Sequence, residues 1–259
     1  MVMQWITLFQ KEIIENWRNY KWIWVPLAIT ALMIMDPITN YYLPEILDKF
    51  GGLPEGAVFD MPTPTVSEAY MMSLGQVGSL GILLFVLVGM GIIAEERKSG
   101  VAEIVLTKPV RDLNYVTAKW ASYALLILIS FTIGLLVAWY YISILYDFVS
   151  FAMILKILFF YGLWLLFVIS LVIFFNTIFR SQGVIAFLSL LVIILISTIS
   201  SVFSHKIPWS PSLISGHIHN LILTDDISKD LVGSGSVSVF LSIVLLFLSV
   251  QFMKSKEII

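Results

Sequence analysis

Long apolar runs alternate with short polar segments along the chain, and this alternation predicts about six membrane-spanning helices. A helix needs about 20 apolar residues to cross the hydrocarbon core of a bilayer. The run at 22–35 is shorter than this, so we expect it to continue through Pro37 toward Leu43. We therefore predict an all-α membrane protein that forms one transmembrane domain over residues 1–259. The predicted spans are 22–35, 74–94, 120–146, 157–179, 184–203 and 237–253.

Residues 1–19 have a different, amphipathic pattern. Trp5, Phe9, Ile13 and Trp17 recur at every fourth position and fall on one face of a helix. Charged and amide side chains occupy the opposite face, which is typical of an elbow helix lying in the membrane interface. The alternative, a surface helix of a soluble domain, is disfavoured because an apolar span follows directly.

Composition agrees with a membrane protein. Of the 259 residues, 59% are hydrophobic and 12% are charged, whereas soluble domains carry about 25% charged residues. Lipid must therefore solvate much of the surface. The absence of cysteine excludes disulfides and cysteine metal sites. The net charge of −2 gives no indication of a nucleic-acid partner.

Lysine and arginine are distributed unequally between the two sides of the predicted bundle. Because cytoplasmic loops are enriched in these residues, the richer side is the cytoplasmic one. This predicts cytoplasmic termini and a cytoplasmic segment 95–119 in a multi-pass protein of the cell membrane. The richer side holds Lys11, Arg18, Lys21, Arg97, Lys98, Lys108, Arg111, Lys119, Arg180, Lys254 and Lys256, and the other side holds Lys49, Lys156, Lys206 and Lys229.

Two longer polar segments fall on the outer side. Six of the seven charged residues in 36–68 are acidic and the segment is rich in proline and glycine, so we expect a long connection with some structure of its own. The outer segment 205–236 precedes the last span. Its part at 207–223 is half apolar, so we expect it to dip back toward the membrane.

The segment 95–119 is the longest polar interruption with an excess of basic residues. Within it, Val101, Ile104 and Val105 have a helix-like apolar spacing, which predicts a short amphipathic helix. Pro109 should end that helix, because proline lacks the N–H and disfavours helix at the preceding residue. Asp112 or Asn114 is then expected to cap the next helix.

This segment resembles the cytoplasmic motif of ABC-2 type transporter permeases. The resemblance rests on Glu96-x-x-x-Gly100, on Glu103 to Leu106, on Pro109-Val110-Arg111 and on Lys119, with Val101 standing where threonine is usual. In that family the segment is the coupling helix that touches an ATPase subunit. The resemblance implies two permease subunits, identical or homologous, with two ATPase subunits in a bacterial or archaeal membrane, and usually export. By this resemblance the coupling residues are Glu96, Gly100, Val101, Ile104, Val105, Pro109 and Arg111.

Each of these residues has an expected role. The apolar residues should pack into a groove of the ATPase, and Glu96 and Arg111 should anchor the segment through polar contacts. Gly100 should permit a turn or a close backbone approach, and Pro109 should fix the exit angle into the next helix.

The sequence contains no Gly-x-x-x-x-Gly-Lys-Ser/Thr loop to hold phosphates. ATP and Mg²⁺ are therefore expected in a separate subunit, and this chain is expected to be non-catalytic and to hold no cofactor. Gly75, Gly78 and Gly81 superficially resemble a nucleotide loop, but they lie in an apolar helix and we expect them to allow close helix packing. Neither His-Glu-x-x-His nor Gly-x-Ser-x-Gly occurs, which disfavours these classes of hydrolase.

Metal binding is a weaker alternative. His205, His217 and His219 lie in the outer segment, where an interfacial loop role is the more usual one. The methionines suit Cu(I) in principle, but apolar packing is their common role. They include Met33, Met35, Met61, Met71 and Met72. Asn176 and Gln182, at an inner membrane edge, are expected to bond or cap helices rather than to bind a metal.

We therefore predict the permease subunit of an ATP-driven ABC transporter. The predicted spans lack charges, which favours an amphiphilic or apolar substrate over a hydrophilic ion. The alternative is a non-transporting membrane sensor or assembly factor that recruits a cytoplasmic partner. A membrane-embedded enzyme is the third possibility.

Overall fold

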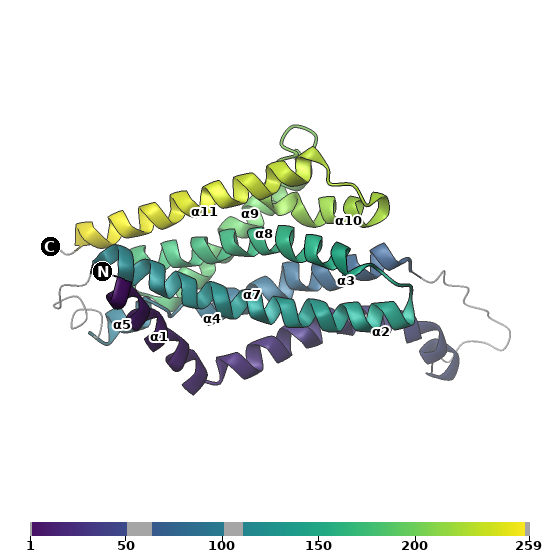
Figure 1. The fold of residues 1–259 in the computed structure, drawn as a ribbon, viewed down its shortest axis with the longest axis horizontal. Helices are drawn as coiled ribbons and strands as arrows, with labels where there is room; N and C mark the ends of the chain where they lie inside the picture. The colour runs from purple at the N-terminus through teal and green to yellow at the C-terminus, as the bar shows by residue number, and fades with distance from the viewer. Residues whose placement is uncertain (1, 51–63, 101–110, 257–259) are drawn as a thin grey trace.

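The computed structural model describes residues 2–50, 64–100 and 111–256, and the elements in these ranges are helices. Figure 1 shows the long helices side by side along one axis, with both termini at the same end. Six helical segments are long and apolar enough to cross a membrane, so the predicted all-α fold with six spans is confirmed. They are Lys21–Leu47, Val66–Lys98, Asp112–Leu145, Phe151–Ile178, Gln182–Val202 and Lys229–Lys254.

The helices alternate with short breaks. Their bounds are α1 Val2–Arg18, α2 Lys21–Phe50, α3 Val66–Gln76, the π-helical turn η1 Val77–Gly81, α4 Ile82–Gly89, α5 Ala94–Lys98, α7 Asp112–Leu145, α8 Phe151–Ile178, α9 Gln182–Val202, the 3-10 turn η2 Pro211–Leu213, α10 Ile214–Thr224 and α11 Lys229–Lys256.

Helix α2 is longer than the sequence pattern predicts. It continues through Pro37, as expected, and also through Pro44 to Phe50, so the first part of the connection 36–68 is helical. Proline is tolerated in such helices where neighbours satisfy the freed carbonyls. Pro37 frees the carbonyl of Met33, four residues before it, and the Ser73 hydroxyl donates to that carbonyl at 2.7 Å. Nearby, the Tyr146 hydroxyl donates to the Pro37 carbonyl at 2.7 Å, and the Gln76 amide donates to the Asp36 carboxylate at 2.6 Å.

The second membrane-crossing helix is built in pieces. It begins at Val66, before the predicted 74, because Thr65 and Glu68 form a capping box that starts α3. The π-helical turn η1 joins α3 to α4, and a non-helical break follows Gly89 before α5 begins at Ala94. This crossing is therefore not one regular helix.

Helix α8 is the centre of the bundle. Of its most apolar stretch, 72% is buried, compared with 28% for each of α2, α9 and α11. Helix α8 packs against α7, α9 and α11. The three less buried helices thus carry most of the surface that lipid or another subunit must cover.

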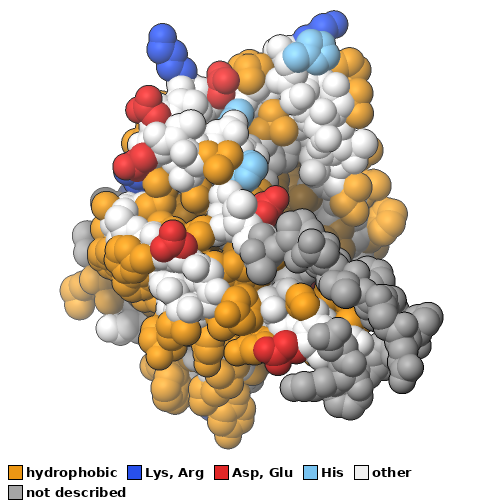
Figure 2. Space-filling model, turned by 90° about the vertical axis from the view of Figure 1, so that its right-hand side faces the viewer, with side chains coloured by type: hydrophobic (Ala, Val, Ile, Leu, Met, Phe, Trp, Pro, Cys, Tyr) orange, Lys and Arg blue, Asp and Glu red, His pale blue; other side chains and the backbone are white. Residues whose placement is uncertain are grey.

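The end opposite the termini is polar at its tip. Figure 2 shows acidic and histidine side chains spread over this end, with hydrophobic side chains gathered at its margins. In the outer segment, η2 and α10 fold back onto α3, α8 and α11, as the half-apolar pattern of 207–223 suggests. Asp225, with φ of 55°, ends α10 in the left-handed conformation.

Candidate functional site

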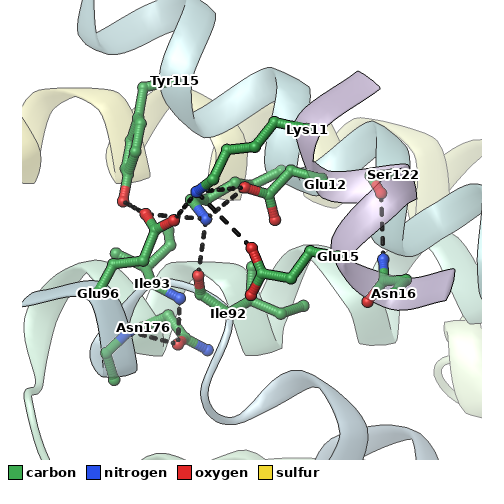
Figure 3. A network of polar contacts seen from close by, with 12 residues as sticks. Lys11, Glu12, Glu15, Asn16, Ile92, Ile93, Glu96, Tyr115, Ser122 and Asn176 are labelled. Atoms are coloured by element: carbon green, nitrogen blue, oxygen red, sulfur yellow. Dashed lines mark hydrogen bonds and ion pairs between the residues drawn. The ribbon is translucent and has the colours of Figure 1, made fainter. Parts of the chain in front are cut away.

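A buried group of charged side chains joins three helices at the end that holds both termini (Figure 3). It contains Lys11 and Glu12 from α1, Glu96 from α5, and Tyr115 and Lys119 from α7, and we call it the Glu96 network. The Lys119 ammonium lies 2.8 Å from the Glu12 carboxylate and 3.0 Å from that of Glu96. Lys11 forms a second ion pair with Glu96. Two ammonium groups therefore connect α1 and α7 to α5.

Burial makes the completeness of this network important. The side chain of Lys119 is 3% exposed and that of Glu96 is 11% exposed. A buried ion pair repays its desolvation only when further hydrogen bonds satisfy both partners. The Tyr115 hydroxyl donates to Glu96 at 2.6 Å, and Lys119 donates to the Ile92 carbonyl at 2.9 Å. Both charges are thus well partnered, and the three helices are held in one relative position.

Lys11 lies in α1, outside the membrane-spanning helices, and the network stabilises the charged form of its ammonium group. Its partial burial by itself would lower the pKa of the ammonium. The hydrogen bond and charge of Glu96, with the charges of Glu12 and Glu15, outweigh burial and raise the pKa above its ordinary value. Lys11 therefore remains charged at every physiological pH.

The carboxylates of Glu12, Glu15 and Glu96 gather within 4.8 Å of one another. The Lys11 ammonium lies within ion-pair distance of all three, at 3.6 Å from Glu12 and 3.7 Å from Glu15. It takes the central position that a bound cation would otherwise occupy. The cluster is therefore an ion-pair network rather than an open set of ligands.

Asn176 of α8 holds the break that separates α4 from α5. Its side-chain oxygen accepts hydrogen bonds from the backbone N–H groups of Ile93 and Ala94, at 3.2 and 3.3 Å. Its amide nitrogen donates to the carbonyls of Gly89 and Val172, at 3.1 and 2.9 Å. One fully buried side chain thus satisfies both ends of the break, which confirms the expected role of Asn176 as a helix cap.

Two hydrogen bonds attach α1 to α7. The Trp5 indole donates to the Thr117 hydroxyl at 3.1 Å, and the Asn16 amide donates to the Ser122 hydroxyl at 3.3 Å. The predicted apolar face of α1 is partly covered, since Trp5 is half-buried whereas Trp17 remains 64% exposed. The elbow helix is therefore attached along its length and still presents apolar surface.

Comparison with known proteins identifies the family. The model of the ABC-2 family of transporter proteins matches residues 6–224, which include α1, the Glu96 network and α10. The chain belongs to the ABC-2 family. It is also similar to an uncharacterised transmembrane protein, YxlG, of Bacillus subtilis (strain 168). The two are 32% identical over 218 residues, which cover 84% of each chain.

The coupling segment expected in this ABC-2 protein is described only at its two ends. Val101, Ile104, Val105 and Pro109 lie outside the described residues, as do all residues of 101–110. Gly100 has φ of 77°, a left-handed conformation that favours glycine, so the backbone turns at the expected position.

At the far end of the segment, Arg111 is exposed and precedes α7 as its N-cap residue. The expected capping by Asp112 or Asn114 is wrong, because α7 already begins at Asp112 and no side chain caps it. Arg111 has extended backbone dihedrals, which are normal for that position.

Gly75, Gly78 and Gly81 make no tight contact with another helix within the described part of this chain, so their close packing stays a prediction. A Cβ added to Gly75 would have nothing within 4 Å, and one on Gly78 would make ordinary contact with the Tyr161 hydroxyl at 3.6 Å. A Cβ on Gly81 would meet only residues of its own helical segment, because the π-helical turn brings Val77 close. Close contacts between a glycine and another helix occur elsewhere in the ABC-2 bundle, for example Gly89 with Tyr123 and Gly134 with Met33. The spacing of glycines along the sequence does not predict these positions.

The residues considered for metal binding have ordinary contacts. A ring nitrogen of His217 bonds the Pro208 carbonyl at 2.8 Å, and His205 is exposed. Met33 is fully buried and faces Gly134, whose added Cβ would lie 2.9 Å from the methionine sulfur. This contact is the apolar packing role that methionine commonly has.

Proposed function

We propose that this chain is the permease subunit of an ATP-driven exporter of an amphiphilic or apolar substrate. In this proposal ATP and Mg²⁺ bind to a separate ATPase subunit, and the segment 95–119 couples the two. Family membership supports a transporter role. The lack of a phosphate-binding loop in the sequence supports the division of labour.

The observation that carries this proposal is the position of the Glu96 network. Glu96 precedes the segment 101–110 and Lys119 follows it, and the two side chains lie 3.0 Å apart. A displacement of the segment would therefore move α5 and α7 together. Through Lys11 and Glu12 it would also reach α1. This arrangement suits a segment that transmits force, because the ion pairs hold the helices on its two sides together.

The mechanism that follows is a two-state movement. Closure of the ATPase dimer on ATP would displace the segment 101–110 on both permease subunits. The helices α1, α5 and α7 would then move as one body relative to the rest of the bundle. A ligand bound elsewhere shifts the equilibrium between two arrangements of the permease by its different affinity for each.

The assembly proposed is two permease subunits, identical or homologous, with two ATPase subunits. Helices α2, α9 and α11 are the least buried of the six crossings and carry exposed apolar residues, as both a second subunit and lipid require. We place the termini and the segment 95–119 in the cytoplasm, because the lysine and arginine residues concentrate on that side.

The test is a double substitution, Ile104→Asp with Val105→Asp, and its matched control is Ile104→Val with Val105→Ile. Both variants are expressed with the neighbouring ATPase at equal permease levels. The aspartate pair should lower ATPase co-purification about tenfold, because buried interface anchors commonly cost more than 1 kcal/mol each. The control should match the parent. If the aspartate variant retains its ATPase and transports like the parent, the segment is not the coupling element. Recovery of a different cytoplasmic partner would favour the sensor or assembly factor.

A further inference from the structure

A polar cavity of about 300 Å³ lies beside the Glu96 network, between α1, α2, α4 and α9. Its walls carry Glu12, Glu15, Lys21, Glu95, Lys119 and Gln182. Ligand pockets start at about 300 Å³, so the cavity has room for a small polar group. It shares Glu12 and Lys119 with that network, but its other charged residues take no part in the proposed ATPase contact.

Two opposite charges in this cavity, those of Lys21 and Glu95, have no ion-pair partner within 4 Å in the described ranges, although acidic neighbours act on Lys21 at longer range. Lys119 pairs with Glu12 at 2.8 Å, and Glu15 lies 3.7 Å from Lys11. Lys21 is half-buried and Glu95 is exposed, and neither makes an ion pair with another residue in the described parts of the chain. The cavity therefore offers one ammonium and one carboxylate to a ligand.

Uncharged polar groups and a glycine complete the lining. A Cβ added to Gly91 would lie 3.0 Å from the Gln182 amide nitrogen and 3.2 Å from the Glu95 carboxylate. These two polar ends therefore converge at Gly91, where a side chain would press against both of them. Asn16 and Asn19 add further amides on the α1 side.

The rims of the cavity differ in polarity. Trp24 of α2 and Leu87 of α4 are 43% and 48% exposed, and both belong to membrane-crossing helices. On the other rim, Glu15 of the amphipathic α1 and Asn19, which follows that helix, are exposed. Tryptophan is enriched where lipid headgroups meet the hydrocarbon. A ligand in this cavity can thus have a polar end inside it and apolar chains along α2 and α4.

We infer that this cavity binds the phosphoethanolamine headgroup of a zwitterionic phospholipid from the leaflet on the side of the termini. The phosphate is held by Lys21, and the ammonium is held by Glu95 with Gln182 beside it. A phosphate and an ammonium in one small headgroup match the two unpartnered charges, whereas phosphoglycerol supplies only the anion. Because this inference does not use the ATPase, its failure would leave the proposed coupling standing, and failure of the coupling would leave it intact.

The test uses the full-length chain in nanodiscs of equal parts phosphatidylethanolamine and phosphatidylglycerol with the same acyl chains. Retained lipid is counted by native mass spectrometry after release into detergent. The parent should keep phosphatidylethanolamine over phosphatidylglycerol by about tenfold, which corresponds to about 1.4 kcal/mol. Glu95→Gln should remove this preference, and Lys21→Gln should lower retention of both lipids.

Further variants separate the cavity from general charge effects. Gly91→Ala leaves every charge in place but narrows the floor, so it should lower phosphatidylethanolamine retention. Lys229→Gln and Asp226→Asn, at the opposite end of the bundle, should behave as the parent. Lys21→Arg keeps the cation and should also match the parent, which guards against a fold defect in Lys21→Gln.

A competition arm distinguishes lipid from a soluble ester. Free O-phosphoethanolamine in hundredfold excess should leave most of the lipid bound, because it lacks the acyl chains. Displacement at equal concentration would overturn the assignment to lipid. Equal retention of both lipids by the parent, or an unchanged preference in Glu95→Gln, would overturn the headgroup site itself.

Discussion

The ammonium of Lys119 and the carboxylate of Glu96 lie 3.0 Å apart and join the second membrane-crossing helix to the third. The two residues stand on opposite sides of the segment 101–110, so this ion pair closes the loop at its base. Figure 3 shows that α1 contributes the remaining charges from the other side. The segment 101–110 is thus flanked on both sides by one buried contact.

Removing Lys119 should destabilise the protein more than removing an exposed lysine. Lys119→Met leaves Glu12 and Glu96 near each other with only Lys11 between them, and loss of one partner of a buried pair costs about 3 kcal/mol. Thermal unfolding of the detergent-purified chain measures the effect. Lys98→Met, an exposed change on α5, should stay within about 0.5 kcal/mol of the parent. Equal midpoints for the two variants would show that the network does not stabilise the fold.

Asn176→Leu should loosen the break between α4 and α5. It removes the acceptor for two backbone N–H groups and a donor to the Gly89 carbonyl. Unpaired buried groups cost about 2 kcal/mol, so backbone amides of 89–98 should exchange with solvent faster. Hydrogen exchange followed by mass spectrometry reports this directly, with Asn220→Leu on exposed α10 surface as the control. Protection that is unchanged in Asn176→Leu would contradict the capping role.

Two glycines in the same membrane crossing should respond in opposite ways to alanine. Gly89→Ala would place a Cβ 2.5 Å from the Tyr123 hydroxyl, and overpacking of this kind costs about 1–3 kcal/mol. Gly75→Ala meets nothing within 4 Å and should be neutral or gain up to about 1 kcal/mol from helix propensity. Unfolding midpoints in detergent compare the two. Similar losses would mean that a second subunit covers Gly75.

Single cysteines should establish the orientation, since the chain has none of its own. Asp226→Cys, on the connection between α10 and α11, should react with an impermeant thiol reagent added outside intact cells. Ser99→Cys, beside α5, should react only after the membrane is opened, because the excess of basic residues on its side predicts that it faces the cytoplasm. Both positions are exposed. The reverse pattern of labelling would contradict the predicted orientation. The segment 95–119 would then lie outside the cell, where it could not contact a cytoplasmic ATPase.

The membrane-spanning part of this fold could be predicted because hydrocarbon imposes a simple length and polarity rule. The rule worked for all six crossings and for the amphipathic helix α1. The rule failed at the ends of the helices, because hydrogen bonds rather than hydropathy determine where a helix begins and ends. The helix α3 begins at a capping box, and α2 passes Pro37 because Ser73 donates to the Met33 carbonyl that the proline frees.

The candidate site was only half predictable. Glu96 and Lys119 could be chosen because a local motif contains them, whereas Lys11 and Glu12 belong to a helix far away in sequence. No periodicity of one chain tells which helix packs on which, so the pairing of α1 with α5 and α7 needed the structure. The spacing of Gly75, Gly78 and Gly81 has the same limit. It shows that these residues lie close together on one helix, but not which helix or subunit packs against them.

The π-helical turn at Val77–Gly81 gives the second crossing two differently oriented halves. An α-helix advances about 100° per residue, and the wider turn accommodates one extra residue, so every side chain after it is rotated by about that angle. The half before the turn packs on α2 and α10, and the half after it packs on α8 and α9. Deleting one residue here would restore a regular helix and swing α4 away from its partners. The extra residue therefore changes which face of the crossing points inward, so that its two halves can pack against different helices.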